Sequence, residues 1–354
     1  MQTEEEAMAI HRRQALICYI LLAFTLVVTL IAKATDNTTT GNWTMSPGSQ
    51  PGTVEFGLMR HHETGGFSHF QSDWPLSAFR GLDASKPGKQ EVRFTIARDA
   101  GKFDCQGYLE NGTGAGVFHF TPDPNYTRDM KALGFVGIDA EKQISMALMD
   151  VTLDFARKMK SENLNGLDTD QLIAFRIHGV TPEFIEALRK EGVRVSEADE
   201  LVAFRIHGVT PEFVAGLRKE GMHVTDNDEL VAFRIHGVTP EMVRALHEAG
   251  YQPDADNLVA MRIHGATPEW IASLQKAGYD HMDIDELIAF RIHGVSPDFI
   301  EKLKSLGYPH PDPDQLVAMR IHGVSPEYIS QLQARGLKSL TVDQLVDMRI
   351  HGIN

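Results

Sequence analysis

Hydrophobic and polar residues follow three different patterns along the chain. Residues 15–31 are apolar without interruption, residues 53–120 contain short segments of alternation, and the rest of the chain has apolar residues at helical spacing. Alternation of period two is typical of half-buried strands. We expect such strands at residues 53–58, 91–96, 102–108 and 116–120.

The alternating region is predicted to be a small all-β module at residues 41–122. Asp99-Ala100-Gly101 and Asn111-Gly112 are typical of tight hairpin turns between the expected strands. About five to seven strands fit into this length. The glycines between Gly107 and Gly116 fit either a sandwich or a short β-solenoid.

The tetrapeptide Arg-Ile-His-Gly occurs seven times in the helical part of the chain. Successive copies are 29 residues apart, except for one spacing of 28. A fixed period of this length predicts a repeat array. The arginines that begin the seven copies are Arg176, Arg205, Arg234, Arg262, Arg291, Arg320 and Arg349.

Each repeat unit is predicted to consist of two short helices. The glycine of the motif is suited to end a first helix. The sequence Thr-Pro-Glu or Ser-Pro-Glu that follows in most units is suited to begin a second helix. Helices of about ten residues are not stable alone. The units must therefore stack, which predicts an α-solenoid of about eight 29-residue two-helix repeats, of which the regular repeat array occupies residues 166–354.

The array is predicted to begin before the first full motif, with capping repeats at residues 123–165. A glycine such as Gly192 follows the second helix of each unit. The equivalent positions 29 and 58 residues earlier in the sequence are Asn163 and Gly134. Residues 139–161 lack the glycine and proline that separate the two helices of other units, so we expect one long helix there. The whole chain is thus predicted to be an α+β multidomain protein.

The amino-terminal residues 1–34 are predicted to be a signal anchor or a signal peptide. The seventeen-residue apolar segment follows Arg12 and Arg13 and is at the lower limit for crossing a bilayer. Ala32-Lys33-Ala34 also fits signal peptidase cleavage. Either interpretation exports the remainder, which would be membrane-anchored and extracytoplasmic, or secreted after cleavage. Residues 35–51, rich in Thr, Asn, Gly, Ser and Pro, are expected to form a linker.

Composition excludes several classes of function. The chain has 354 residues and a formal net charge of −14, which repels the phosphate backbone, so we expect no nucleic-acid partner. Two cysteines cannot build a disulfide framework or a cysteine-rich zinc site. No metalloprotease, nucleophile-elbow or phosphate-loop motif is present in the sequence. We therefore expect no enzyme activity, cofactor or metal.

The motif arginines are predicted to be buried structural clamps. On a helical wheel Arg176 lies between Leu172 and Ile173, within the apolar arc. A buried guanidinium needs partners, and the candidates are acids such as Asp170 or Glu183, or the free carbonyls at the end of a neighbouring helix. His178 and its equivalents are expected at helix ends, about 8 to 10 Å apart, too far to share one zinc ion.

The units differ from one another mainly on the outer face of the second helix. Because that variation has been tolerated or used, we expect a protein partner to bind there. The candidate partner-binding residues are Glu186, Arg244, Ser273, Lys302 and Gln331. A periodic cell-wall polymer would instead suit the row formed by Ala174, His178 and their equivalents.

The β module contains one cluster of chemically active residues. His61, His62, Glu63, His69 and Asp73 lie close together in the sequence. The simplest interpretation is a solvated loop between strands. The alternative is a metal, ligand-sensing or catalytic site, which would make the protein a sensor or an enzyme.

The repeat units resemble those of uncharacterised bacterial exported proteins, including the tails of membrane-anchored sensor metallopeptidases of the β-lactam-sensor type. The resemblance is carried by the pattern D-x-L-V-A-M-R-I-H-G-V-(T/S)-P-E-(F/Y)-I and covers roughly residues 124–354. The zinc motif and the multiple membrane spans of the peptidase are absent from this sequence. The resemblance therefore implies a non-enzymatic exported interaction scaffold.

Overall fold

The structure is a computed structural model that describes residues 40–61, 67–84 and 86–353. The expected signal segment, the first residues of the expected linker, and His62 and Glu63 lie outside the described residues. No helix of the described part is both long and apolar enough to cross a membrane. The chain divides into two compact units, with residues up to Lys160 and Asp168–Ile173 in the first and Ser161–Leu167 and Ala174 onwards in the second.

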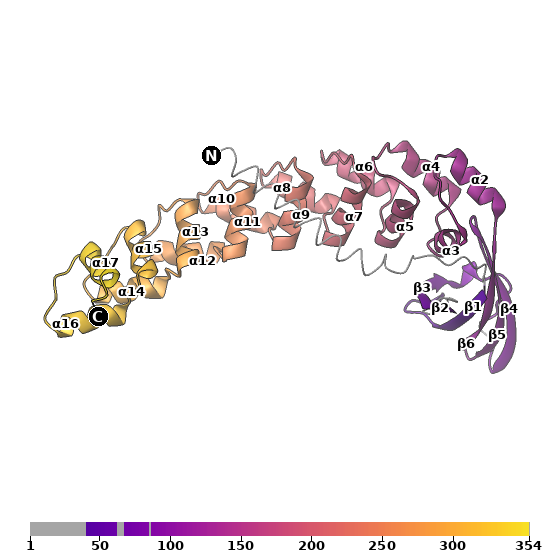
Figure 1. The fold of residues 1–354 in the computed structure, drawn as a ribbon, viewed down its shortest axis with the longest axis horizontal. Coiled ribbons are helices and arrows are strands. Elements are labelled where there is room, and N and C mark those ends of the chain that lie inside the picture. The colour runs from indigo at the N-terminus through magenta and orange to yellow at the C-terminus, as the bar shows by residue number, and fades with distance from the viewer. Residues whose placement is uncertain (1–39, 62–66, 85, 354) are drawn as a thin grey trace. The chain divides into compact units, whose positions relative to one another are not determined.

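The amino-terminal part of the first unit is a six-stranded antiparallel sheet in the order β3-β2-β1-β6-β5-β4 (Figure 1). Two three-stranded meanders are joined by the pairing of β1 with β6. The strands are β1 (Thr40–Pro47), β2 (Thr53–His61), β3 (Phe67–Pro75), β4 (Lys89–Arg98), β5 (Gly101–Glu110) and β6 (Thr113–Pro122). The four expected strands and both hairpin turns are confirmed.

Two predictions about this region are wrong. Thr40–Pro47 is strand β1 and not part of a linker, because its side chains of Trp43 and Met45 are buried in the core of the sheet. Phe67–Pro75 is strand β3 and not a solvated loop. Both segments are rich in polar residues, and their pairing with β2 stabilises them as strands.

The sheet curls around an aromatic core. The rings of Phe56 in β2 and Phe94 in β4 are only 6.1 Å apart. Four strand steps separate these strands, which in a flat sheet would place them about 19 Å apart. Arg80, beyond β3, exchanges two backbone hydrogen bonds of 2.9 Å with Thr95 of β4 and so draws the two ends of the sheet together. Because every pairing is antiparallel, the short β-solenoid is excluded.

A pair of glycines makes room for the largest side chain of this core. Gly116 of β6 pairs with Trp43 on one side and with Gly107 of β5 on the other. The indole of Trp43 is fully buried, and its Nε1 donates a hydrogen bond of 3.1 Å to the carbonyl of Gln106. An added Cβ at either glycine would lie 2.7 Å from an indole atom. The sheet therefore requires glycine at both positions.

Sixteen short helices follow among the described residues and form a repeating, α-solenoid-like array. The helices are α2 (Pro124–Ala132), α3 (Ala140–Leu148), α4 (Leu153–Ser161), α5 (Thr169–His178), α6 (Pro182–Lys190), α7 (Ala198–His207), α8 (Pro211–Lys219), α9 (Asn227–His236), α10 (Pro240–Glu248), α11 (Ala255–His264), α12 (Pro268–Lys276), α13 (Ile284–His293), α14 (Pro297–Ser305), α15 (Pro313–Ile321), α16 (Pro326–Ala334) and α17 (Val342–Ile350). From α5 onwards, odd-numbered helices are the first helices of their units and even-numbered helices are the second.

Local sequence fixes the ends of these helices, as α7 and α8 illustrate. Gly208 adopts a left-handed φ of 74° and ends α7, and the amide of Val209 then donates to the carbonyl of Phe204. Thr210 caps α8 by accepting a hydrogen bond of 3.2 Å from the amide of Phe213. First helices from α7 to α17 pack against one another, and second helices do the same. The predicted two-helix repeat is thereby confirmed.

In the capping repeats the predicted turn positions are confirmed, but the predicted single long helix is not. Gly134 and Asn163 have positive φ angles, as the 29-residue register requires. The expected long helix at residues 139–161 is wrong, because α3 and α4 are separate. Asp150 adopts the left-handed conformation usually taken by glycine, with φ of 52°, and Thr152 caps α4 in place of the Thr-Pro pair. Polar residues thus supply the break that glycine and proline supply elsewhere.

Helix α3 is attached to the sheet within the first unit. The side chain of Gln143 is buried and donates hydrogen bonds of 2.7 and 2.8 Å to the carbonyls of Ala100 and Asp123. Arg60 of β2, also buried, forms an ion pair with Glu141. These side chains connect both meanders of the sheet to the first helices that follow it.

Candidate functional site

A row of exposed isoleucines runs along the array. The isoleucine of every Arg-Ile-His-Gly motif has between 47% and 57% of its surface exposed, whereas Leu172, Phe175 and their equivalents in α7, α9, α11, α13 and α15 are buried. We call these residues the isoleucine row: Ile177, Ile206, Ile235, Ile263, Ile292, Ile321 and Ile350. A large aliphatic side chain that is half exposed at the same place in seven units is unusual on a soluble surface.

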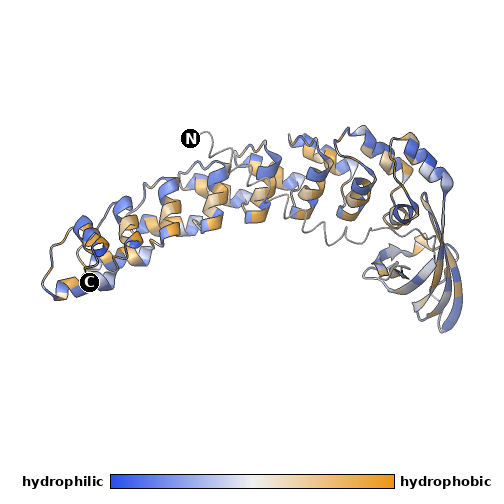
Figure 2. Cartoon of the chain, in the orientation of Figure 1, coloured by the Kyte–Doolittle hydropathy of each residue, from blue (hydrophilic) through white to orange (hydrophobic). Residues whose placement is uncertain are grey.

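The isoleucine row lies at the centre of one face of the first helices. Residues seven positions earlier are two helical turns away on the same side, and in all seven units that residue is an exposed aspartate. A half-buried alanine lies three positions before the isoleucine in six units. The motif histidine directly follows the isoleucine in all seven units. We call this surface the first-helix face. Figure 2 shows that orange, hydrophobic segments recur from helix to helix along the array.

The motif arginines are exposed, so the prediction of their burial is wrong for Arg176, Arg205, Arg234, Arg262, Arg291 and Arg320; Arg349 is half buried. The apolar arc of the wheel is wider than the part of each helix that neighbouring units cover. Helix-end carbonyls, one of the two kinds of partner predicted for them, are contacted. The Nε of five arginines donates to the carbonyl of the motif histidine in the preceding unit: Arg205 to His178 (2.9 Å), Arg234 to His207 (3.4 Å), Arg262 to His236 (3.2 Å), Arg291 to His264 (3.0 Å) and Arg320 to His293 (3.2 Å).

The same guanidinium groups lie over aromatic rings of the preceding second helix. The guanidinium carbon of Arg205 is 4.9 Å from the ring centre of Phe184, and Arg291 is 5.1 Å from that of Trp270. Arg234, Arg320 and Arg349 have equivalent contacts with Phe213, Phe299 and Tyr328. Such contacts stabilise exposed sites by about 0.5 to 1 kcal/mol each. The arginines thus act as clamps between units, without being buried.

The histidines contribute mainly their backbone to these clamps. Their carbonyls receive the arginines, and partial burial lowers the pKa of His178 and His207 below the ordinary histidine value. A ring nitrogen of His351 does contact its helix end, with Nδ1 2.8 Å from the carbonyl oxygen of Asp347. Among the described residues, no three His, Cys, Asp or Glu side chains are grouped to hold a metal ion.

The predicted partner-binding residues of the second helices lie on the surface, with Ser273 half buried. Three of them form ion pairs within the array. Glu186 is 3.2 Å from Arg189, Lys302 is 2.8 Å from Asp298, and Arg244 is 3.7 Å from Glu220. Ser273 donates a hydrogen bond to the carbonyl of Trp270, and Gln331 is exposed. Their charges are therefore partly matched by neighbours in the same chain.

The structure separates His69 and Asp73, two members of the predicted β-module cluster, along one strand. His69 and Asp73 lie four residues apart on the same strand, β3, which separates their α-carbons by about 13 Å. Asp73 accepts hydrogen bonds from the backbone and side chain of Ser49, and these hold the pKa of Asp73 below its usual value. His69 and Asp73 are too distant to bind one metal ion together.

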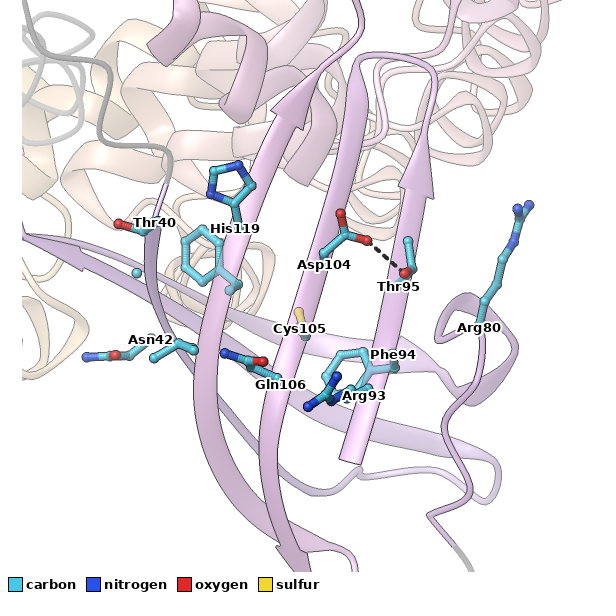
Figure 3. Close-up of a pocket in the computed structure, with 13 residues that line it drawn as sticks. Thr40, Asn42, Arg80, Arg93, Phe94, Thr95, Asp104, Cys105, Gln106 and His119 are labelled. Carbon is cyan, nitrogen blue, oxygen red and sulfur yellow. Dashed lines mark hydrogen bonds between the residues drawn. The ribbon is translucent and has the colours of Figure 1, made fainter. Parts of the chain in front are cut away.

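The β module has a hollow of about 760 Å³ on its polar side, which the sequence did not indicate (Figure 3). Neighbouring strands place His119, Asp104 and Thr95 side by side, and Thr95 donates a hydrogen bond of 2.9 Å to Asp104. Arg80 and Arg93 also line the hollow. These side chains are exposed or half exposed, so the hollow is an open sheet surface.

The described cysteine is not suited to act as a nucleophile in this hollow. Cys105 is 3% exposed, and burial raises the pKa of its thiol far above the ordinary range. Asp104 and Gln106 point to the polar side of the sheet, whereas alternation directs Cys105 into the core. Cys105 is thus a small residue of the core.

Comparison with known proteins adds no assignment to these surfaces. No model of a known protein family matches the chain, and no curated protein sequence matches it. The extended first-helix face therefore has to be interpreted from its own chemistry.

Proposed function

We propose that the helical array is a non-enzymatic scaffold that binds a segment of another protein along the first-helix face. The observation that carries this proposal is the isoleucine row, half exposed in all seven units. Packing within the array explains the buried leucine and phenylalanine of each first helix, and the clamp explains the arginine. Neither explains an isoleucine that faces solvent. An exposed apolar residue repeated in this way along one surface is typical of protein interaction sites.

Differences between the units support this choice over the second helices. The outer positions of the second helices vary from Glu186 to Arg244 and Gln331. No residue type is shared by all units at those positions, whereas every first helix from α5 onwards retains isoleucine. Repeat arrays use such extended faces to bind long partners without one deep pocket.

The charge of the face favours a basic partner. From residue 168 onwards the chain has 29 acidic residues against 18 Lys and Arg, a net charge of −11. The exposed aspartates of the first helices add a negative edge beside the isoleucine row. Complementary charge would steer a segment that carries lysine or arginine towards this face.

We further propose that both described units lie outside the cytoplasm, tethered to the membrane or released from it. The uninterrupted apolar segment at 15–31, the paired arginines before it and the resemblance to repeats of exported proteins support this location. A reporter enzyme that is active only outside the cytoplasm, fused after Asp36, should be active. Activity of a cytoplasmic reporter fused at the same place would refute the location.

Capture of partners by matched variants tests the binding surface. We expect the wild-type full chain to retain a specific protein from an envelope extract, and the variant Ile206→Ser/Ile235→Ser/Ile263→Ser to retain at least ten times less of it. The variant Arg244→Glu/Lys302→Glu alters the second helices and should behave as wild type. Circular dichroism melts of all three proteins check that the array is intact.

The opposite pattern decides against the first-helix face. If the charge reversals abolish capture while the serine variant retains it, the partner binds the second helices. If neither variant changes what is retained, the array surface is not the binding site.

A further inference from the structure

The regular spacing of the isoleucine row restricts the conformation of what it binds. The arginine clamps repeat with the same partners in five consecutive units, with hydrogen bonds of 2.9 to 3.4 Å. Neighbouring first helices are therefore held in the same way throughout the array. Packed helices lie about 8 to 10 Å apart. The isoleucines accordingly recur at about that distance in a line across the helices.

Only some backbone conformations present side chains at this interval on one side. A β-strand repeats on one face about every 6.8 Å, which falls short of the helix spacing. Seven residues of an α-helix rise about 10.5 Å, which exceeds it. A polyproline II segment has three residues per turn and a rise of 3.1 Å, so every third side chain faces the same way at about 9.3 Å. This last interval falls within the range.

We infer that the first-helix face binds an extended, left-handed polyproline II segment that carries an aliphatic residue at every third position and basic residues beside it. The inference rests on the proposed function and specifies the chemical class of its partner. Each aliphatic side chain would contact the isoleucine and alanine of one first helix.

The edges of the face match the other two sides of such a segment. In a three-fold helix the remaining positions point sideways, and those on one side point towards the aspartates in the first turn of each first helix. Lysine or arginine there would meet opposite charge. A polyproline II backbone has no internal hydrogen bonds, so its carbonyls are available. The exposed rings of His236, His264 and His322 can donate to them from the other edge.

A synthetic peptide provides a direct test. Helices α7, α9, α11, α13 and α15 offer five consecutive isoleucine and alanine pairs, which corresponds to fifteen ligand residues. The probe is therefore (Leu-Pro-Lys)5 with a fluorescent label. The control peptide has the same composition with its leucines alternately two and four residues apart. Fluorescence anisotropy with the full chain should show at least tenfold tighter binding of the regular peptide.

Variants of the chain link this preference to the face. Ile206→Ser/Ile235→Ser/Ile263→Ser should weaken binding of the regular peptide at least tenfold, whereas Arg244→Glu/Lys302→Glu should change it less than twofold. Asp199→Asn/Asp228→Asn/Asp256→Asn, which removes charge with little change of shape, should weaken it several-fold and reduce its dependence on salt.

The outcomes separate the inference from the proposed function. Equal affinity for both peptides would show that charge alone attracts them and would overturn the polyproline II inference. If neither peptide binds while capture of an envelope protein still depends on the isoleucines, the inference fails and the proposed function stands. Sedimentation of the chain with purified cell-wall polymer, lost in the serine variant, would overturn both in favour of a polymer ligand.

Discussion

Replacement of Gly116 by valine is expected to destabilise the β module by at least about 3 kcal/mol. A Cβ at this position would lie 2.0 Å from the carbonyl oxygen of Gln106 and 2.7 Å from the indole nitrogen of Trp43. The first neighbour is backbone of a paired strand, and the second is the fully buried centre of the aromatic core. Neither can move aside without breaking the sheet or the hydrogen bond from Trp43 to Gln106.

Gly52→Ala is the matched control for this prediction. Gly52 lies in the turn before β2, has a φ of 81° and has no atom within 4 Å of an added Cβ. Its replacement should cost only the left-handed backbone strain, about 1 kcal/mol. Unfolding in urea followed by the fluorescence of Trp43 and Trp74 would measure both. Equal midpoints for the two variants would contradict the requirement for glycine beneath the indole.

Replacement of Gly265 by alanine is expected to destabilise the array by about 3 kcal/mol. The residue ends α11 with a φ of 75°, which costs alanine about 1 to 2 kcal/mol. Its new Cβ would also lie 2.7 Å from a terminal nitrogen of Arg291. The guanidinium would have to leave both the carbonyl of His264 and the ring of Trp270, which adds about 1 to 2 kcal/mol.

Gly250→Ala separates backbone strain from the clamp. Gly250 ends a second helix with a φ of 91°, and an added Cβ there meets nothing within 4 Å. Circular dichroism melts should therefore show a smaller loss for Gly250→Ala than for Gly265→Ala. In the background of Arg291→Ala, the two glycine replacements should cost about the same, because the clamp is already gone. An undiminished excess in that background would mean that Arg291 is not what the glycine accommodates.

The repeat array could be predicted from the sequence because its signals are local. Pro211, Thr210 and Gly208 act within one turn of the helix ends that they define, so their pattern determines where helices begin and end. The break at Asp150 was missed because aspartate adopts the left-handed conformation far less often than glycine. Strands β1 and β3 were missed because their stability comes from distant pairing partners.

The candidate site could be predicted only in part. Periodicity identifies the apolar arc of a first helix but not how much of it the adjacent units cover. Arg176 lies within that arc and is nevertheless exposed, as is Ile177. One signal was available in the sequence. Every residue of the tetrapeptide is invariant among the units, yet its isoleucine is exposed in all seven of them. An isoleucine that is invariant among the units without being buried indicates a role beyond packing.

The direction of the arginine contacts has a consequence for how the protein is made. Each motif arginine reaches a carbonyl of the unit before it, and never one of the unit after it, in the five hydrogen-bonded pairs of the described array. A ribosome produces the chain in the same order. Every arginine thus emerges when its acceptor already exists on a finished neighbour, so the array is suited to assemble during synthesis, one unit at a time.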